Sequence, residues 1–338
     1  MAVGISGYGV FIPRLRIKRE EYVKAWGSFA AAGVAEKSVM GFDEDVLTSA
    51  AKVSKRALES VPLSPDKVSR FALASTSPPY TEKLLSGTVL VTVGVPNATY
   101  SSDHTTSTRA GTEAIIAGFE HVMANPKGIA LVAAADAPRA SMWGSVEHQL
   151  GAGAAAYVLS SENLVAELEG HASNVTEHFG ERFKPRDDPL LHDLNVKKFA
   201  EGALISNTTK AASSLMKKLN RKPEEYQHVV IQQPDAKVPS SVGGKLGFTE
   251  PQLAAGLVSK NLGDLGAASV PVGLAAVLDI AKVGDKVLVV SYGSGAGADA
   301  LSFKVVGDRK AVPRVQAEMD RKEYIEYVKY LKLKGAIV

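Results

Sequence analysis

The chain has 338 residues, of which 45% are hydrophobic and 22% are charged, a composition typical of a folded globular protein. This excludes disorder, collagen and coiled coil as descriptions of the whole chain, and the length suffices for one large domain or two fused halves. Lys and Arg total 39 against 36 Asp and Glu, and a net charge of only +3 argues against general nucleic-acid binding. The chain contains no Cys, which excludes disulfides, thiolate metal sites and a cysteine nucleophile.

The N-terminal residues differ from a secretory signal. Glycines interrupt the apolar residues of segment 1–12, and the positive charges follow that segment instead of preceding it. No window approaches the roughly 18 unbroken apolar residues of a membrane span. We therefore expect a cytoplasmic protein that does not interact with a membrane.

Helical spacing followed by a strand-like run recurs in the first half of the chain. Residues 45–58 carry apolar side chains at helical intervals and precede a predicted strand at 71–75. Residues 111–124 predict a buried helix of small residues, and residues 128–135 predict the buried strand after it. This alternation favours a layered α/β fold.

The same order of elements recurs in the second half. Helices are predicted at 209–219 and 271–281, and strands at 228–233 and 286–291. The offset between paired segments is roughly 140–160 residues, which indicates a duplicated domain and not a solenoid. We predict two homologous α/β halves, residues 1–165 and 166–338. The second includes a C-terminal tail, residues 314–334, expected to form a terminal helix or strand pair.

A Gly/Ala-rich loop leads into a strand in each half, and residues 151–159 match residues 295–303. Residues 293–297 fit neither a Walker A nor a dinucleotide fingerprint and have a near-copy at Gly151, so close backbone packing is the first interpretation and a site-lining role the second. The seven His residues lack metal-ligand spacing, so no metal site is expected. His104 lies in a polar run before a buried helix and is the most site-like; Ser107 or Thr108 in that run are alternatively helix caps.

Specific strings at matching places resemble the thiolase superfamily, and within it the short, archaeal type of 3-hydroxy-3-methylglutaryl-CoA synthase. The resemblance covers nearly the whole chain and implies a thiolase fold, with two duplicated βαβαβαββ-type halves in a five-layer αβαβα arrangement and a usual homodimer. The strings are residues 7–9, 12–18, 36–38, 43–45, 110–112, 151–156, 245–249, 273–279 and 289–297.

The resemblance also implies a Cys nucleophile assisted by a Glu and a His. Thr108 stands at the position of the Cys, Thr76 at that of the Glu and Gln232 at that of the His. An alcohol without an adjacent base is a poor substitute for a thiolate. With all three groups replaced, ordinary synthase activity is not expected.

Some residues that would hold coenzyme A are retained. Lys237 matches the family's Lys beside the substrate, and Ser294 matches a Ser that lines the ligand. Arg14, Arg16 and Lys18 are candidates for contacts with phosphates at a pocket mouth, or else are merely solvated. Residues 182–199 depart from the family pattern, which leaves the acyl-binding wall open.

Two functional hypotheses follow. The first is a non-catalytic scaffold or CoA-channel subunit that assembles with a Cys-bearing thiolase and a small zinc-ribbon/OB-fold acyl-CoA-binding protein. Claisen-type acyl transfer would then occur in the thiolase. This chain resembles the Cys-less, synthase-like subunit of the diacetylphloroglucinol acyltransferase complex, which also has a Gln-Gln string where the His belongs.

The second hypothesis is a Cys-independent aldolase that cleaves a β-hydroxyacyl-CoA by proton transfer alone. This chemistry needs an acid and a base within hydrogen-bond reach of the substrate. Its candidates lie on or beside family pocket segments: Tyr80, His104, Asp264 (where the family has an Asn) and Tyr292.

Overall fold

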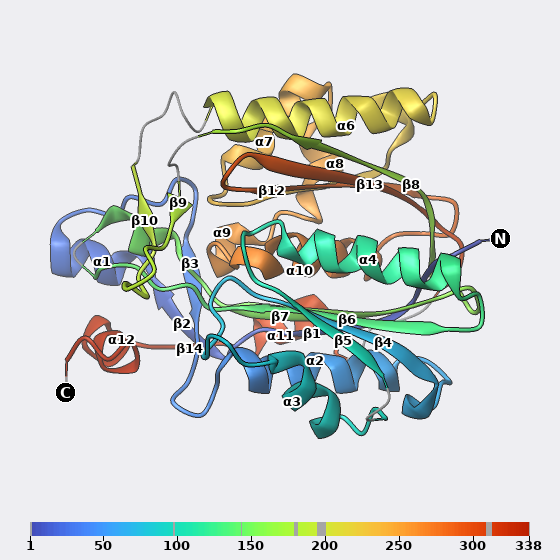
Figure 1. Cartoon of the computed structure of the whole chain (residues 1–338). Coiled ribbons are helices and arrows are strands. Elements are labelled where there is room, and N and C mark those ends of the chain that lie inside the picture. The colour runs from blue at the N-terminus through green and yellow to red at the C-terminus, as the bar shows by residue number, and fades with distance from the viewer. Residues whose placement is uncertain are drawn as a thin grey trace.

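The computed structural model describes residues 2–96, 99–142, 144–178, 182–194, 201–308 and 313–337. Their largest sheet has nine strands, and its two ends fold toward each other across a layer of helices (Figure 1). Helices also cover both outer faces, which gives the predicted five-layer αβαβα arrangement (Figure 1). The expected thiolase fold is therefore confirmed.

The first half supplies five strands of this sheet and the helices beside them. In spatial order the strands are β1 (Gly4–Phe11), β7 (Gly153–Ser160), β6 (Ile129–Asp136), β4 (Val68–Ala74) and β5 (Tyr100–His104). The helices are α2 (Val46–Glu59), α3 (Leu85–Thr92) and α4 (Ala110–Ala124).

The second half repeats this pattern. Its strands are β8 (Ala166–Val175), β13 (Gly297–Val305), β12 (Lys286–Gly293) and β11 (His228–Ile231), and β8 joins the halves by pairing with β1. Its helices are α6 (Ser206–Lys218), α7 (Val238–Leu246), α8 (Glu250–Ala254), α9 (Ser259–Leu262) and α10 (Ser269–Leu278).

Strand direction reveals the duplication. β4 pairs with β6 in parallel while β7 is antiparallel to β6, and β11, β12 and β13 repeat these relations. β5 extends the first half beside β4, and the described residues of the second half add no equivalent strand to the sheet. The halves are thus alike in their centres and different at their outer edges.

The predicted helices and strands correspond to α2, β4, α4, β6, α6, β11, α10 and β12. The largest shifts are of three residues: β4 begins at Val68 and α6 at Ser206, each three residues before the expected start. Helix α10 begins at Ser269, two residues early, and ends at Leu278, three residues early. Pro271 is tolerated there because the first-turn N–H groups of a helix have no intrahelical acceptor. Asp45 accepts a hydrogen bond from the N–H of Thr48 at 2.7 Å, which fixes the start of α2.

Helices α4 and α10 lie between the two ends of the sheet (Figure 1) and are built from small residues. A Cβ atom on Gly111 would stand 2.3 Å from the carbonyl oxygen of Ala267, so only glycine permits this approach. The glycine turns also pack closely, since a Cβ atom on Gly151 would lie 1.9 Å from the Leu262 carbonyl oxygen. Close backbone packing is therefore confirmed for that turn.

A smaller structure flanks one end of the sheet. It contains a three-stranded sheet of β14 (Glu323–Tyr324), β2 (Leu15–Lys18) and β3 (Glu36–Val39), together with the helices α1 (Arg19–Trp26) and α12 (Tyr327–Leu333). Helix α11 (Val315–Asp320) lies apart from it, against β1 and α10 (Figure 1). The tail thus forms two helices around one short strand. A two-stranded ribbon, β9 (Arg182–Phe183) and β10 (His192–Asp193), lies close by (Figure 1).

Short helical turns complete the described chain. They are η1 (Pro65–Lys67), η2 (Ser145–Gln149), η3 (Glu201–Ile205), η4 (Pro223–Glu225) and η5 (Gly266–Ala268). No described helix is long and apolar enough to cross a membrane.

Candidate functional site

A cavity of about 890 Å³ lies where several loops of the two halves meet. Its walls come from residues 40–42, 44–46, 76–79, 81, 105–108, 137–139, 182–189, 191, 294 and 333–334. Thr76, Thr108 and Ser294, three of the residues that sequence analysis singled out, line it. The cavity is also lined by β9, by the loop that follows it and by the end of α12. Sequence analysis connected the segment of β9 with the acyl-binding wall, but it did not connect the end of α12 with a site.

Thr108 lies just before α4 and is buried. Its hydroxyl donates a hydrogen bond of 2.6 Å to the backbone carbonyl oxygen of Tyr292. A carbonyl oxygen cannot accept the hydroxyl proton as a general base would, so this contact does not activate the alcohol. The alternative helix-cap role for Ser107 or Thr108 is wrong: α4 has Arg109 at its N-cap position and no side-chain cap.

Thr76 follows β4 and faces Asp136, the last residue of β6. Asp136 is fully buried and accepts hydrogen bonds from the Thr76 hydroxyl at 2.6 Å, the Thr76 N–H at 3.0 Å and the Ala267 N–H at 2.8 Å. The hydroxyl groups of Ser75 and Ser77 also donate to it. These bonds satisfy a buried carboxylate without a cation in direct contact.

Asp264 is fully buried and forms an ion pair with Arg182, which comes from the ribbon and lines the cavity. The second carboxylate oxygen accepts from the Gly266 N–H at 2.9 Å. Gln232 is buried beside this segment and donates to the Gly266 carbonyl oxygen at 3.3 Å. Arg182 thus covers Asp264 on the cavity side.

The other aldolase candidates do not meet in this cavity. Tyr80 is exposed, Tyr292 is buried on β12, and His104 lies on β5 with Nε2 3.3 Å from the Ser102 hydroxyl. Burial lowers the pKa of His104. None of these three, nor Asp264, belongs to the described lining of the cavity.

The proposed phosphate ligands also lie outside that lining. Arg14 pairs with Glu323, Lys18 stands over the Tyr324 ring, and Arg16 is fully buried with a hydrogen bond to the Pro13 carbonyl oxygen. Burial lowers the pKa of Arg16 to about 10. The alternative that these side chains are merely solvated is wrong for Arg16.

Lys237 precedes α7 and is likewise absent from the described lining. The ribbon takes the place of these residues at the cavity: Lys184 donates to the carbonyl oxygen of Thr76, and the Arg182 N–H donates to the Ser294 hydroxyl at 3.2 Å. Residues 195–199 of the divergent segment lie outside the described residues.

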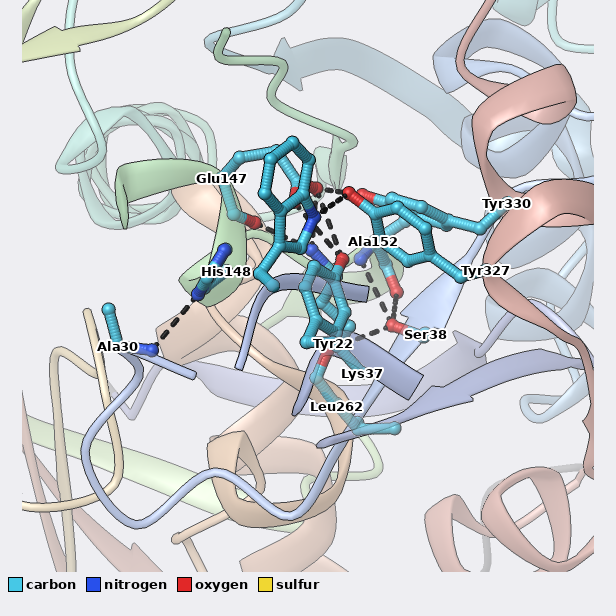
Figure 2. Close-up of polar contacts among 11 residues, drawn as sticks. Tyr22, Ala30, Lys37, Ser38, Glu147, His148, Ala152, Leu262, Tyr327 and Tyr330 are labelled. Carbon is cyan, nitrogen blue, oxygen red and sulfur yellow. Dashed lines mark hydrogen bonds and ion pairs between the residues drawn. The ribbon is translucent and has the colours of Figure 1, made fainter. Parts of the chain in front are cut away.

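A buried polar cluster adjoins the cavity (Figure 2). Lys37 of β3 is fully buried and forms an ion pair with Glu147 of η2 at 2.6 Å. Tyr22 donates to Glu147 at 3.1 Å, and Tyr330 of α12 also donates to it. Figure 2 shows these side chains gathered around the carboxylate. The cluster fastens α12 to the rest of the protein, and α12 carries Leu333 and Lys334 into the cavity wall.

The residues around the cavity contain no group of three or more His, Cys, Asp and Glu side chains that could hold a metal ion, and the same is true of all the chain that the structure describes.

Comparison with known proteins identifies relatives along the whole chain. A hydroxymethylglutaryl-CoA synthase of Methanobrevibacter smithii is 33% identical over 344 residues, covering 99% of each protein, and one of Methanococcus vannielii is 35% identical over 348 residues, with the same coverage. Residues 216–305 match the family described as 3-oxoacyl-[acyl-carrier-protein (ACP)] synthase III C terminal.

Solved structures agree with this fold. MvaS in complex with 3-hydroxy-3-methylglutaryl coenzyme A has a TM-score of 0.85 at 18% identity, covering 98% of this chain and 91% of that one. An HMG-CoA synthase complexed with CoA has a TM-score of 0.87 at 19% identity, with 98% and 90% coverage. Fold and matched segments define a thiolase-superfamily protein. Within that class, the identity to the archaeal relatives shows that the chain belongs to the hydroxymethylglutaryl-CoA synthase family.

Sequence reasoning missed Asp136, Arg182 and Lys334. For Asp136 a signal existed, because a carboxylate ends an otherwise apolar, buried strand. Arg182 and Lys334 reach the cavity from segments far away in the chain, and no spacing in the sequence indicates such contacts.

Proposed function

We propose that this chain is a non-catalytic member of its family that holds an acyl-CoA in the cavity and acts as a scaffold or CoA-channel subunit for a partner acyltransferase. The observation that carries this proposal is that the polar groups at the three family positions are engaged in hydrogen bonds within the protein. Thr108 bonds to a backbone carbonyl, Thr76 bonds to Asp136, and Gln232 bonds to the Gly266 carbonyl. The cavity itself is retained.

The proposed complex contains a Cys-bearing thiolase, which performs Claisen-type carbon–carbon bond formation, and a small zinc-ribbon/OB-fold protein that binds acyl-CoA. The same resemblance that suggested these partners links the chain to the Cys-less subunit of the diacetylphloroglucinol acyltransferase complex. The CoA and HMG-CoA named for the two solved relatives support a CoA thioester as the ligand.

We also propose that the chain pairs with a second copy of itself along β5. Among the described strands, β5 pairs only with β4 and leaves its other edge open. Tyr100 on β5 and Val91 on the adjoining α3 are exposed. An open edge strand flanked by apolar side chains favours pairing with another chain.

The aldolase alternative has less support, because its four candidate residues do not share the cavity. Purification of the tagged protein from its own cells, followed by mass spectrometry of stoichiometric partners, separates the two. Recovery with a Cys-bearing thiolase and the zinc protein supports the scaffold. A clean homodimer that cleaves a β-hydroxyacyl-CoA contradicts it, and Asp264→Ala and His104→Ala then test the aldolase.

Restoring the nucleophile is a second test. Thr108→Cys alone is expected to give no condensation product with acetyl-CoA and acetoacetyl-CoA, because the positions of the acid and base remain Thr76 and Gln232. Titration of the new thiol with a thiol reagent shows whether it is accessible. Turnover by the single variant contradicts the proposal that the chain lacks its own chemistry.

A further inference from the structure

Lys334 lies at the junction of the cavity and the buried polar cluster. It follows α12 directly and lines the cavity together with Leu333. Its Nζ atom stands 5.6 Å from the centre of the Tyr330 ring, and its backbone carbonyl oxygen accepts a hydrogen bond of 2.9 Å from Arg139. Lys334 is therefore held at its backbone, its amine lies beside the Tyr330 ring of the cluster, and the residue forms part of the cavity wall.

The charged groups around this amine come from three other elements. Lys37 of β3 and Arg139 after β6 are positive, and Glu147 of η2 is negative. Glu147 is already engaged by Lys37 at 2.6 Å and by Tyr22 and Tyr330. With Lys334 protonated, three cations would share one carboxylate, so the neutral amine is favoured.

Burial, Lys37 and Arg139 together lower the pKa of Lys334 to about 8, against the opposing effect of Glu147. A substantial fraction of the amine is then neutral near pH 7.5. Desolvation and neighbouring cations are the means by which a protein makes a lysine nucleophilic.

We propose that Lys334 is an acyl-accepting residue, whose amine takes the acyl group from a CoA thioester in the cavity to give an N-acyl-lysine. This inference rests on the proposed binding of acyl-CoA. The amine nitrogen attacks the thioester carbonyl carbon, a C–N bond forms and the C–S bond breaks. Coenzyme A leaves as the thiol, carrying the proton that the amine loses, and nothing is oxidised or reduced.

The product fits the electrostatics of the cluster. An amide at Lys334 carries no charge, so Lys37 keeps its ion pair with Glu147 without competition from a second lysine. Acylation therefore removes a charge that burial already disfavours. It also places an acyl chain in the cavity wall, where it reduces the space for a second thioester.

The test uses the wild-type protein with acetyl-CoA, and mass spectrometry of proteolytic peptides gives the rate at each lysine. Lys332, exposed on the same helix, is the internal control. Activation by burial and neighbouring cations predicts that Lys334 reacts about 10- to 100-fold faster than Lys332 at pH 7.5. Its rate should saturate with acetyl-CoA and level off above pH 8, and Lys334→Arg should abolish the fast phase alone.

Two further measurements separate this inference from the proposed function. Calorimetry with coenzyme A reports binding, and acetyl-N-acetylcysteamine, a thioester without the nucleotide, reports the reactivity of the amine by itself. If coenzyme A binds and Lys334 reacts no faster than Lys332, the inference is overturned and the proposed function stands. If coenzyme A does not bind, the proposed function fails, and so does the cavity-bound donor that the inference requires. If Lys334 then still reacts preferentially with the small thioester, its amine is activated, but the inferred transfer from a bound acyl-CoA is overturned.

Discussion

The floor of the cavity and its C-terminal wall use polar side chains in opposite ways. On the floor, Thr76, Thr108 and Asp136 are engaged with one another or with the backbone, and Asp264 is paired with Arg182. At the wall, two lysines compete for Glu147 and one of them faces the cavity. The polar groups of the floor are therefore engaged with the protein itself, whereas the wall contains the lysine that we propose to accept an acyl group.

The floor shows that replacement of a family's catalytic groups need not leave their substitutes without hydrogen-bond partners. A buried polar atom without a partner costs about 1–3 kcal/mol, so replacements that bond to their surroundings are favoured. In this chain the replacements are a threonine bonded to Asp136, a threonine bonded to a carbonyl, and an amide bonded to η5.

The largest expected effect is at the wall. Glu147→Gln removes the only carboxylate that contacts the fully buried Lys37 within the described structure. Leaving a buried charge unpaired costs about 3–5 kcal/mol of the free energy of unfolding, as measured by denaturant titration. The variant should also weaken the attachment of α12, because the amide offers one acceptor oxygen to Lys37, Tyr22 and Tyr330, which share two carboxylate oxygens in the wild type.

Glu59→Gln is the control for this variant. Glu59 lies 4.0 Å from Lys55 on the exposed face of α2, and such a surface pair contributes less than about 1 kcal/mol. A loss below about 1 kcal/mol for Glu147→Gln would mean that Lys37 is neutral or hydrated, and the account of the wall would be wrong.

The floor provides the next effect. Arg182→Met removes the cation from buried Asp264, and we expect a loss of about 2–4 kcal/mol in the free energy of unfolding, because Asp264 keeps its hydrogen bond from Gly266. Adding Asp264→Asn should recover most of that loss, since the amide carries no charge. Arg186→Met, on the exposed part of the same segment, is the control. A double variant as unstable as Arg182→Met would show that Arg182 acts by packing alone.

Lys334→Met tests the wall through the pH dependence of the free energy of unfolding. The folded-state pKa of Lys334, about 8, lies below the ordinary value near 10.4, so the unfolded chain binds a proton more tightly. This penalty on folding is fully present below pH 8 and disappears as pH rises toward 10.4. The variant should therefore be more stable than the wild type by about 1–3 kcal/mol at pH 7, with the difference vanishing near pH 10.

Lys332→Met should show no such change in the difference between pH 7 and pH 10, because Lys332 is exposed on the same helix. Thermal or denaturant unfolding at pH 7 and pH 10 measures this difference in stability. An advantage of Lys334→Met that is equal at the two pH values would indicate added apolar burial and no relief of charge.

Much of the fold followed from local patterns. The apolar spacing of α2 and the small residues of α4 and α10 are continuous in the sequence, and their repetition after about 140–160 residues predicted the duplication. Short motifs also located Thr76, Thr108 and Ser294, all of which line the cavity.

The remaining parts of the site depend on contacts between distant segments. Arg182 meets Asp264 and Lys334 approaches Lys37 only after the ribbon and α12 have packed. For Arg16 the sequence predicted a contact that the structure does not support. Its basic neighbours suggested that it binds phosphates, whereas it is buried on β2, between β14 and β3. Pattern alone does not distinguish a buried cation from a solvated one.

The smallest effect concerns Thr108. Thr108→Val keeps the shape of the side chain but removes the hydrogen bond of 2.6 Å to the Tyr292 carbonyl oxygen. We expect a loss of about 1 kcal/mol in the free energy of unfolding, the usual contribution of one buried hydrogen bond. Thr106→Val, at an exposed position of the same cavity, should change it by less than about 0.5 kcal/mol.

The same pair of variants distinguishes a quiet floor from a hidden active site. If the Thr108 hydroxyl serves only the Tyr292 carbonyl, Thr108→Val leaves the affinity for coenzyme A, measured by calorimetry, within about twofold of the wild type, because no ligand contact is lost. A larger loss of affinity with unchanged stability would mean that the hydroxyl turns toward the ligand. The floor would then resemble the wall, because each would present a polar side-chain group to the bound ligand.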